Sequence, residues 1–138
     1  MIRFVFLFAL LAAGCGSGKL SAPSTSPVSG TVQLKGKPVA GVKVTFHAKF
    51  DMGGDVKFTP NGMTNKDGKF SLSTAAANDG APPGEYAVTF ELLRAGTDKA
   101  GLDVEVDQWK GKYADPEKST FKVTIQKGDN ALQPFDLN

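Results

Sequence analysis

The sequence predicts an all-β protein, a seven-stranded antiparallel β-sandwich. Apolar and polar residues alternate with a period of two in several short segments, as expected for strands with one buried face. Turn-forming residues separate these segments, and the 138-residue chain contains 16 Gly and 8 Pro. Long stretches of helix-forming residues are absent. Short strands with turn signals between them favour a sandwich over a βαβ architecture.

The first fourteen residues differ from the rest and predict a signal peptide. Met1–Arg3 gives a short positive start, Phe4–Leu11 is an unbroken apolar run, and Ala12–Gly14 are small. This order of charge, apolar core and small residues is typical of secretory signals. The apolar run is too short to cross a bilayer as a helix, which needs about 20 residues.

Cys15, the only cysteine in the chain, follows directly. Leu11-Ala12-Ala13-Gly14-Cys15 resembles the lipobox of bacterial lipoproteins, in which cleavage precedes the cysteine and its sulfur receives a diacylglycerol. The position three before the cysteine is Ala12, where that family more often has Leu. The alternative is an ordinary signal peptide cut near an Ala-x-Ala-like site, with Cys15 incidental.

The lipobox resemblance implies a membrane partner. Two or more acyl chains hold a protein stably on a membrane, whereas one chain does so only marginally. Gly16 is not the Asp that retains enteric lipoproteins at the inner membrane, so the resemblance implies the outer membrane, periplasmic side or cell surface. An envelope protein or polysaccharide is the further partner expected. The chain has 16 basic and 14 acidic residues, and loss of Arg3 leaves a net charge of about +1. This balance argues against nucleic-acid binding.

Residues 15–27 are predicted to comprise the lipidated cysteine and a flexible tether, because residues 16–27 are rich in Gly, Ser and Pro and lack periodic apolar residues. A coil of this length has an end-to-end distance of roughly 20 Å. Residues 28–138 form the predicted sandwich domain, a normal size for a single core.

The first half of this domain alternates clearly. Val28–Leu34 is a predicted strand, and Lys35–Pro38 a turn. Val42–Phe50 is the most regular half-buried strand, with Val42, Val44 and Phe46 on one face. Asn65–Gly68 predicts a hairpin between short strands at 63–64 and 69–72, since Asp-Gly tolerates a positive φ.

The second half has strands at Tyr86–Leu92, Phe121–Gln126 and Phe135–Leu137. Residues 94–119 are a long connection, which is expected to be functional or to have local structure of its own. Asp115-Pro116-Glu117 predicts a helical turn, with Asp as N-cap and Pro at N1. Within the connection Asp103, Glu105 and Asp107 would share one face if extended. They could then hold Ca²⁺, although a solvated strand face is the favoured interpretation.

Four segments carry a family resemblance: Val28–Val32, Gly36–Val42, Thr64–Phe70 and Pro83–Tyr86. They resemble the carboxypeptidase regulatory-like, or transthyretin-like (prealbumin-like), β-sandwich. The chain is also similar to small planctomycete lipoproteins of this type, which often carry a Lys-Tyr-Ala-Asp-Pro stretch followed by Ser, here within 112–119. The resemblance covers about residues 28–138 and implies a Greek-key sandwich. It implies little about function.

No catalytic or cofactor site is predicted. His47 is the only histidine and falls on the polar face of its strand. A zinc site needs three or four ligands, which Cys15 and one histidine cannot supply. No Gly-x-Ser-x-Gly elbow indicates a nucleophile. The transthyretin-like enzyme that hydrolyses 5-hydroxyisourate uses several histidines and a C-terminal Tyr-Arg-Gly-Ser, whereas this chain ends Phe-Asp-Leu-Asn.

Trp109 and Tyr113, in the long connection, are the predicted ligand contacts. Exposed aromatic residues can stack on sugars or on a protein partner. The alternative is that both rings fold back to cover an open end of the sandwich. The sequence therefore predicts a membrane-anchored, non-catalytic envelope lipoprotein with a structural or protein-interaction sandwich. The alternative hypothesis is a carbohydrate- or peptide-binding lipoprotein that uses the aromatic residues around Trp109.

Overall fold

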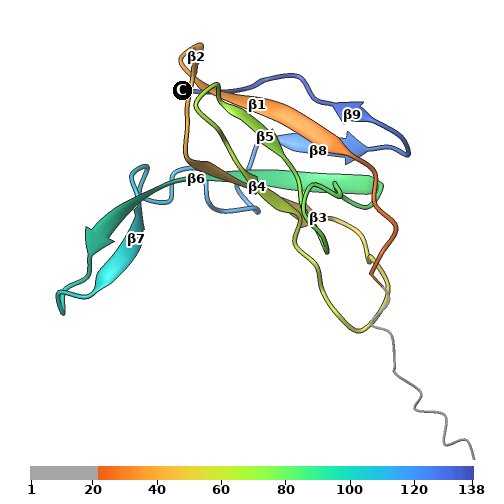
Figure 1. The fold of residues 1–138 in the computed structure, drawn as a ribbon, viewed down its shortest axis with the longest axis horizontal. Coiled ribbons are helices and arrows are strands. Elements are labelled where there is room, and N and C mark those ends of the chain that lie inside the picture. Colours follow the sequence, from red (N-terminus) through yellow and green to blue (C-terminus); the bar gives the residue numbers. More distant parts are fainter. Residues whose placement is uncertain (1–21) are drawn as a thin grey trace, which may run out of the picture.

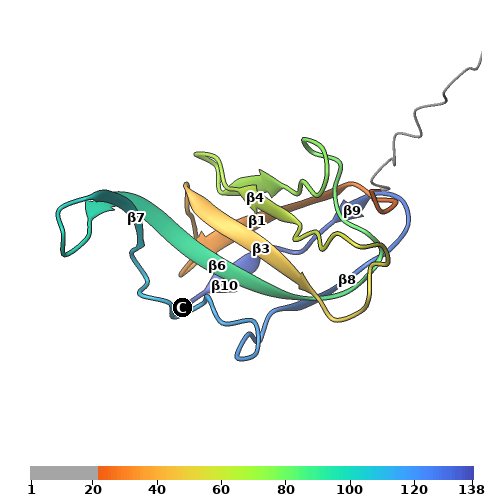
Figure 2. The same ribbon diagram turned by 90° about the horizontal axis from the view of Figure 1, so that it is seen from below.

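The computed structural model describes residues 22–138, and these residues form two β-sheets and no helix (Figures 1 and 2). The all-β prediction is therefore confirmed for this part of the chain. The predicted signal peptide and Cys15 lie outside the described residues. Within the described range no helix could span a membrane.

The first sheet is organised around one central strand, β1, which pairs with four others. β2 and β5 run antiparallel to β1, whereas β9 and β10 run parallel to it. The bounds are β1 (Val28–Leu34), β2 (Lys37–Pro38), β5 (Lys69–Ser71), β9 (Asn130–Ala131) and β10 (Phe135–Leu137).

The second sheet is organised around the long strand β6, with order β4-β3-β6-β7 and β8 also paired with β6. All of its pairs are antiparallel. The bounds are β3 (Val42–Ala48), β4 (Asn61–Met63), β6 (Gly84–Thr97), β7 (Asp103–Asp107) and β8 (Lys122–Ile125).

The core consists of the inward-facing residues of both sheets. The alternation predicted from the sequence is observed in β3, where Val42, Val44 and Phe46 are fully buried. A chain of aromatic rings crosses the core, because Phe135 of the first sheet packs on Phe90 of the second at a centroid distance of 5.2 Å. Phe135 also stacks with Phe70, at 6.2 Å.

The predicted hairpin around Asn65–Gly68 forms its turn but not its paired strands. Gly68 has a φ of +73° and its N–H donates to the Asn65 carbonyl at 2.9 Å. β4, however, pairs with β3, and β5 pairs with β1. The two segments are nevertheless joined at both ends of the hairpin, because the Asn65 N–H donates to the Lys69 carbonyl at 2.8 Å and Asn61 forms an antiparallel bridge with Ser73. The hairpin prediction is thus confirmed for the turn and for the bonds at its two ends, whereas the ladder pairs of β4 and β5 are made with β3 and β1.

The connection at 94–119 is structured. β6 continues past the core to Thr97 and folds back through β7, so that residues 93–107 make a β-hairpin, the arm, that projects from the body (Figure 1). The predicted helical turn at Asp115 is a tight turn and not a helix. Its carboxylate accepts the Glu117 N–H at 2.9 Å and its carbonyl accepts the Lys118 N–H at 3.2 Å.

Candidate functional site

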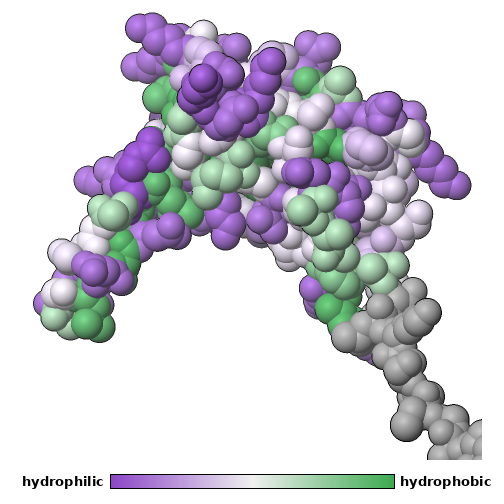
Figure 3. All heavy atoms as spheres, in the orientation of Figure 1, coloured by the Kyte–Doolittle hydropathy of each residue, from purple (hydrophilic) through white to green (hydrophobic). Residues whose placement is uncertain are grey.

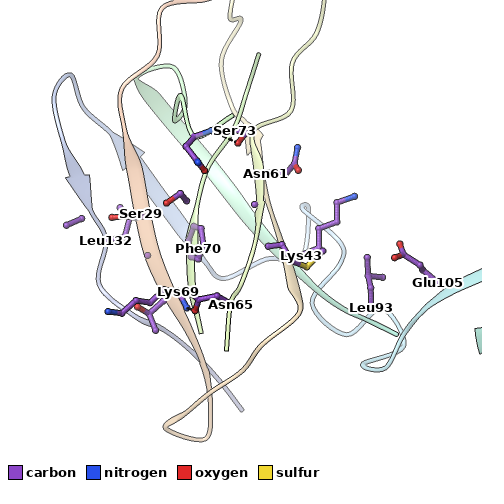
Figure 4. Close-up of a pocket in the computed structure, with 17 residues that line it drawn as sticks. Ser29, Lys43, Asn61, Asn65, Lys69, Phe70, Ser73, Leu93, Glu105 and Leu132 are labelled. Carbon is purple, nitrogen blue, oxygen red and sulfur yellow. Dashed lines mark hydrogen bonds between the residues drawn. The ribbon is translucent and has the colours of Figure 1, made fainter. Parts of the chain in front are cut away.

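An open groove of about 860 Å³ lies on the outside of the molecule (Figure 4). It crosses the outer faces of β1, β5, β4 and β3, where the two sheets meet, and reaches the arm at Leu93 and Glu105. Ser29, Ser71 and Asn61 contribute hydroxyl and amide groups to its wall. Gly62 also lines the groove, and a side chain is excluded there because a Cβ would overlap the Ser71 carbonyl oxygen.

Two lysines give the groove a positive charge. Lys43 comes from β3 and Lys69 from β5, and Glu105 of the arm is the carboxylate in the lining. Within residues 22–138 the ion pair that forms lies elsewhere, between Lys49 and Glu117. Ammonium, hydroxyl and amide groups can bind an anionic or hydroxyl-rich ligand. The lining contains no histidine or cysteine.

The groove was not predicted from the sequence. The alternation of apolar and polar residues places Lys43, Lys69 and Ser29 on the outer faces of their strands, and this is the indication of the groove that the sequence contains. Their convergence depends on the pairing of β5 with β1 and of β4 with β3, together with the bridge between Asn61 and Ser73 that holds β4 beside β5.

Trp109 and Tyr113, the predicted ligand contacts, lie together and pack partly against the core cluster. Their rings meet edge-to-face at a centroid distance of 5.3 Å. The Tyr113 hydroxyl donates to the carbonyl of Asn138, and the Lys112 ammonium donates to the same oxygen at 2.6 Å. These contacts hold the C-terminal residue against the connection. A ligand-binding role for the two rings stays a prediction.

The segment at 103–107 is extended, as strand β7, so the three carboxylates of the connection share one of its faces. The Asp107 carboxylate is engaged by three nearby backbone N–H groups. One oxygen accepts the N–H groups of Leu92 and Trp109, each at 3.0 Å, and the other accepts that of Gly111 at 2.9 Å. Across residues 22–138 no three His, Cys, Asp or Glu side chains are grouped closely enough to hold a metal ion.

His47 borders a second hollow, of about 880 Å³, inside the loop 49–60. Asp51, Asp55 and Glu117 also border this hollow. Two of the carboxylates are engaged, because Asp51 accepts the Gly53 N–H at 2.8 Å and Glu117 pairs with Lys49 at 3.6 Å. Nε2 of His47 lies 2.8 Å from the Thr89 hydroxyl. The histidine is therefore fixed by a threonine and not by a carboxylate.

We expect His47 to make unfolding pH-dependent. Burial and the charge of Lys49 lower its pKa below the ordinary 6.5, and Glu91 opposes this shift. Because the unfolded chain then takes up the proton at a higher pH, the stability conferred by neutral His47 is complete above pH 6.5 and is lost as the pH falls below it. In urea unfolding at about pH 7.5 and about pH 5.5, His47→Gln should lose less stability on acidification than the parent. Equal losses in both proteins would contradict this.

Comparisons with known proteins identify a family. No curated protein matches the chain. Among solved structures, a 9R-lipoxygenase from Cyanothece PCC8801 matches with 12% identity and a TM-score of 0.47, over 83% of this chain and 16% of the lipoxygenase. The chain thus spans about a sixth of that enzyme's length. A family described as a domain of unknown function (DUF6795) matches residues 28–120, more than half of the chain. The chain therefore belongs to the DUF6795 family.

Proposed function

We propose that this protein is a membrane-anchored, non-catalytic envelope lipoprotein whose β-sandwich serves as a structural or protein-interaction module. The observation that carries the proposal is the segment Leu11–Cys15, which resembles a lipobox, follows an apolar run and contains the only cysteine. Ser26 is already paired with the domain through Ala81. Roughly ten residues then lie between Cys15 and this pairing.

The proposed fold is a seven-stranded Greek-key sandwich of the transthyretin-like, carboxypeptidase regulatory-like type. When the two-residue strands β2 and β9 and the arm strand β7 are set apart, seven strands remain: β1, β3, β4, β5, β6, β8 and β10. The buried Tyr86 hydroxyl donates to the Pro82 carbonyl at 2.6 Å. A tyrosine bonded to backbone a few residues upstream resembles the corner found in Greek-key sandwiches, which supports this proposal.

The non-catalytic part of the proposal is supported by how polar side chains are used. Asp79 accepts the N–H groups of Thr74, Ala75 and Ala76 and so shapes a loop. Asp107 and Asp115 bind backbone N–H groups in the connection. His47 bonds to a hydroxyl. The three aspartates thus shape turns and loops, and His47 links neighbouring strands, which are structural roles.

An intact mass of the protein extracted from membranes tests the anchor. We expect a chain that begins at Cys15 and carries added acyl mass, and we expect Cys15→Ser to prevent acylation and to move the protein out of the membrane fraction. The physical reason is that several acyl chains hold stably, at about 0.8 kcal/mol for each buried methylene.

Ser17→Ala is the matched control, since it changes a neighbouring small residue and leaves the cysteine in place. It should keep both the acyl mass and the membrane location. A mature mass without lipid, or an unchanged membrane fraction for Cys15→Ser, would contradict the anchor.

A further inference from the structure

The arm ends in an open strand edge. Among residues 22–138, β7 pairs with β6 on one side and is the last strand of its sheet. The Asp98 N–H donates to the Leu102 carbonyl and the Gln108 N–H donates to the Leu92 carbonyl, each at 2.9 Å. Because antiparallel pairs alternate between bonded and non-bonded, the even-numbered residues of β7 face β6. The backbone groups of Asp103 and Glu105 therefore point away from the sheet.

The opposite edge of the arm is closed by a side chain. Arg94 donates from Nη1 to the Leu93 carbonyl at 2.9 Å and from Nη2 to the Ala40 carbonyl at 3.2 Å. The guanidinium therefore covers the edge of β6 next to Leu92, the residue at which the pairing of β6 with β3 ends. The edge available for a further strand is thus that of β7.

The two faces of the arm differ in chemistry. Val104 and Val106 lie on one face, opposite Gly96 and Arg94. They are 37% and 39% exposed, and Leu102 beside them is 64% exposed, so that apolar atoms are visible on the arm in Figure 3. The other face carries Asp103 and Glu105. Such an exposed, alternating edge strand is a template for pairing with another chain.

A second copy of this chain is a poor partner for the edge. Antiparallel pairing of two β7 strands about Glu105 would set Glu105 directly opposite its own copy and Asp103 opposite Asp107. Like charges directly opposite one another destabilise a pair of strands. The charge pattern thus selects against self-association and is complementary to a cationic strand.

We propose that the open edge of β7 binds an extended basic segment of a partner protein as an added antiparallel strand. We expect the added strand to place Lys or Arg residues opposite Asp103 and Glu105. The residues between them, opposite Val104 and Val106, are then β-branched and apolar. Backbone bonds supply affinity in such strand addition, and alternate side chains supply specificity. The inference rests on the proposed protein-interaction role and names the class of partner.

The probe is a capped peptide, Lys-Val-Lys-Val-Lys-Val-Lys, titrated into the full mature protein in detergent. We expect binding that shifts the NMR amide signals of Asp103 and Glu105. A Glu-Val alternating peptide should not bind. Methylation of the peptide's lysine backbone nitrogens should abolish binding, because these N–H groups face β7. Methylation of its valine nitrogens should leave binding intact, because those N–H groups face solvent.

Protein variants separate charge from edge pairing. Glu105→Gln should weaken binding about fivefold, the size of one cross-strand charge pair. Glu105→Pro should abolish it, since proline removes an outward N–H and is tolerated on edge strands. Glu85→Gln, an exposed change at the far end of β6, should have no effect. An unchanged NMR spectrum for β1 and β3 would show that the proline variant is folded.

Several outcomes would overturn the inference: no binding of the basic peptide, equal binding of the acidic peptide, unimpaired binding of the lysine-methylated peptide, or self-association of the protein through β7. An acylated protein that ignores the basic peptide would overturn this inference and leave the anchor standing. A protein that binds the peptide but lacks acyl mass would contradict the anchor and leave the strand-addition inference standing.

Discussion

Replacing Phe90 with alanine should lower the free energy of unfolding by about 3–5 kcal/mol, the usual cost of removing a fully buried phenylalanine ring. Phe90 is completely buried in the middle of β6. Its ring lies 5.2 Å, centroid to centroid, from both Phe121 and Phe135. Phe135 belongs to the other sheet, so the truncation would leave a cavity at the contact between the two sheets.

Urea unfolding followed by the emission of Trp109 would measure this loss. A domain of this size has a total stability of about 5–15 kcal/mol, so the variant should unfold at a much lower urea concentration. The dependence of the free energy on urea should stay unchanged, because the same surface is exposed on unfolding.

Phe58→Ala is the matched control. Phe58 is partly buried in the loop 49–60 and lies outside the core cluster. Its truncation should cost about 0.5 kcal/mol, as for other changes away from packed sites. Equal losses for both variants, or a loss below about 1 kcal/mol for Phe90→Ala, would contradict the ring chain as the main contact between the sheets.

The sequence predicts those strands that have one face in the core. β1, β3 and β10 alternate because alternate residues are buried between the sheets, and their predicted and observed bounds agree closely. The alternation in β6 stops at Leu92 for a physical reason. Beyond that residue the strand leaves the core and pairs with β7 in solvent, so that no burial pattern marks it.

The candidate sites were less predictable. The groove brings Ser29, Asn61 and Lys69 together from three strands, and the pairing of β4 and β5 with different sheets follows from long-range packing that local turn chemistry does not encode. Trp109 and Tyr113 were identified by residue type alone. The acceptor of the Tyr113 hydroxyl is the carbonyl of Asn138, which lies 25 residues away in sequence and carries no motif.

Gly80→Ala should disrupt the point at which the tether joins the domain. Gly80 has a φ of +90°, and a Cβ there would overlap the Ser26 carbonyl oxygen and lie 2.8 Å from Cα of Pro27. Ser26 and Ala81 exchange two backbone bonds, of 2.9 and 3.0 Å. We expect a loss of about 3 kcal/mol, from the strained backbone together with these two bonds.

Gly80 has little freedom to move away. Its N–H donates to the Leu72 carbonyl at 2.9 Å, and its carbonyl accepts the Thr74 hydroxyl at 2.7 Å. Because the glycine is held from both sides, the N-terminal segment must give way. Hydrogen exchange should therefore accelerate at the Ser26 and Ala81 amides before it changes in β3 and β6.

Gly54→Ala separates strain from overlap. Gly54 also has a positive φ, +76°, but a Cβ there meets no atom within 4 Å. It should cost about 1 kcal/mol from backbone strain alone and should leave exchange at Ser26 unchanged. If Gly80→Ala cost no more than Gly54→Ala, the overlap with Ser26 would add nothing to the backbone strain, and this prediction would be contradicted.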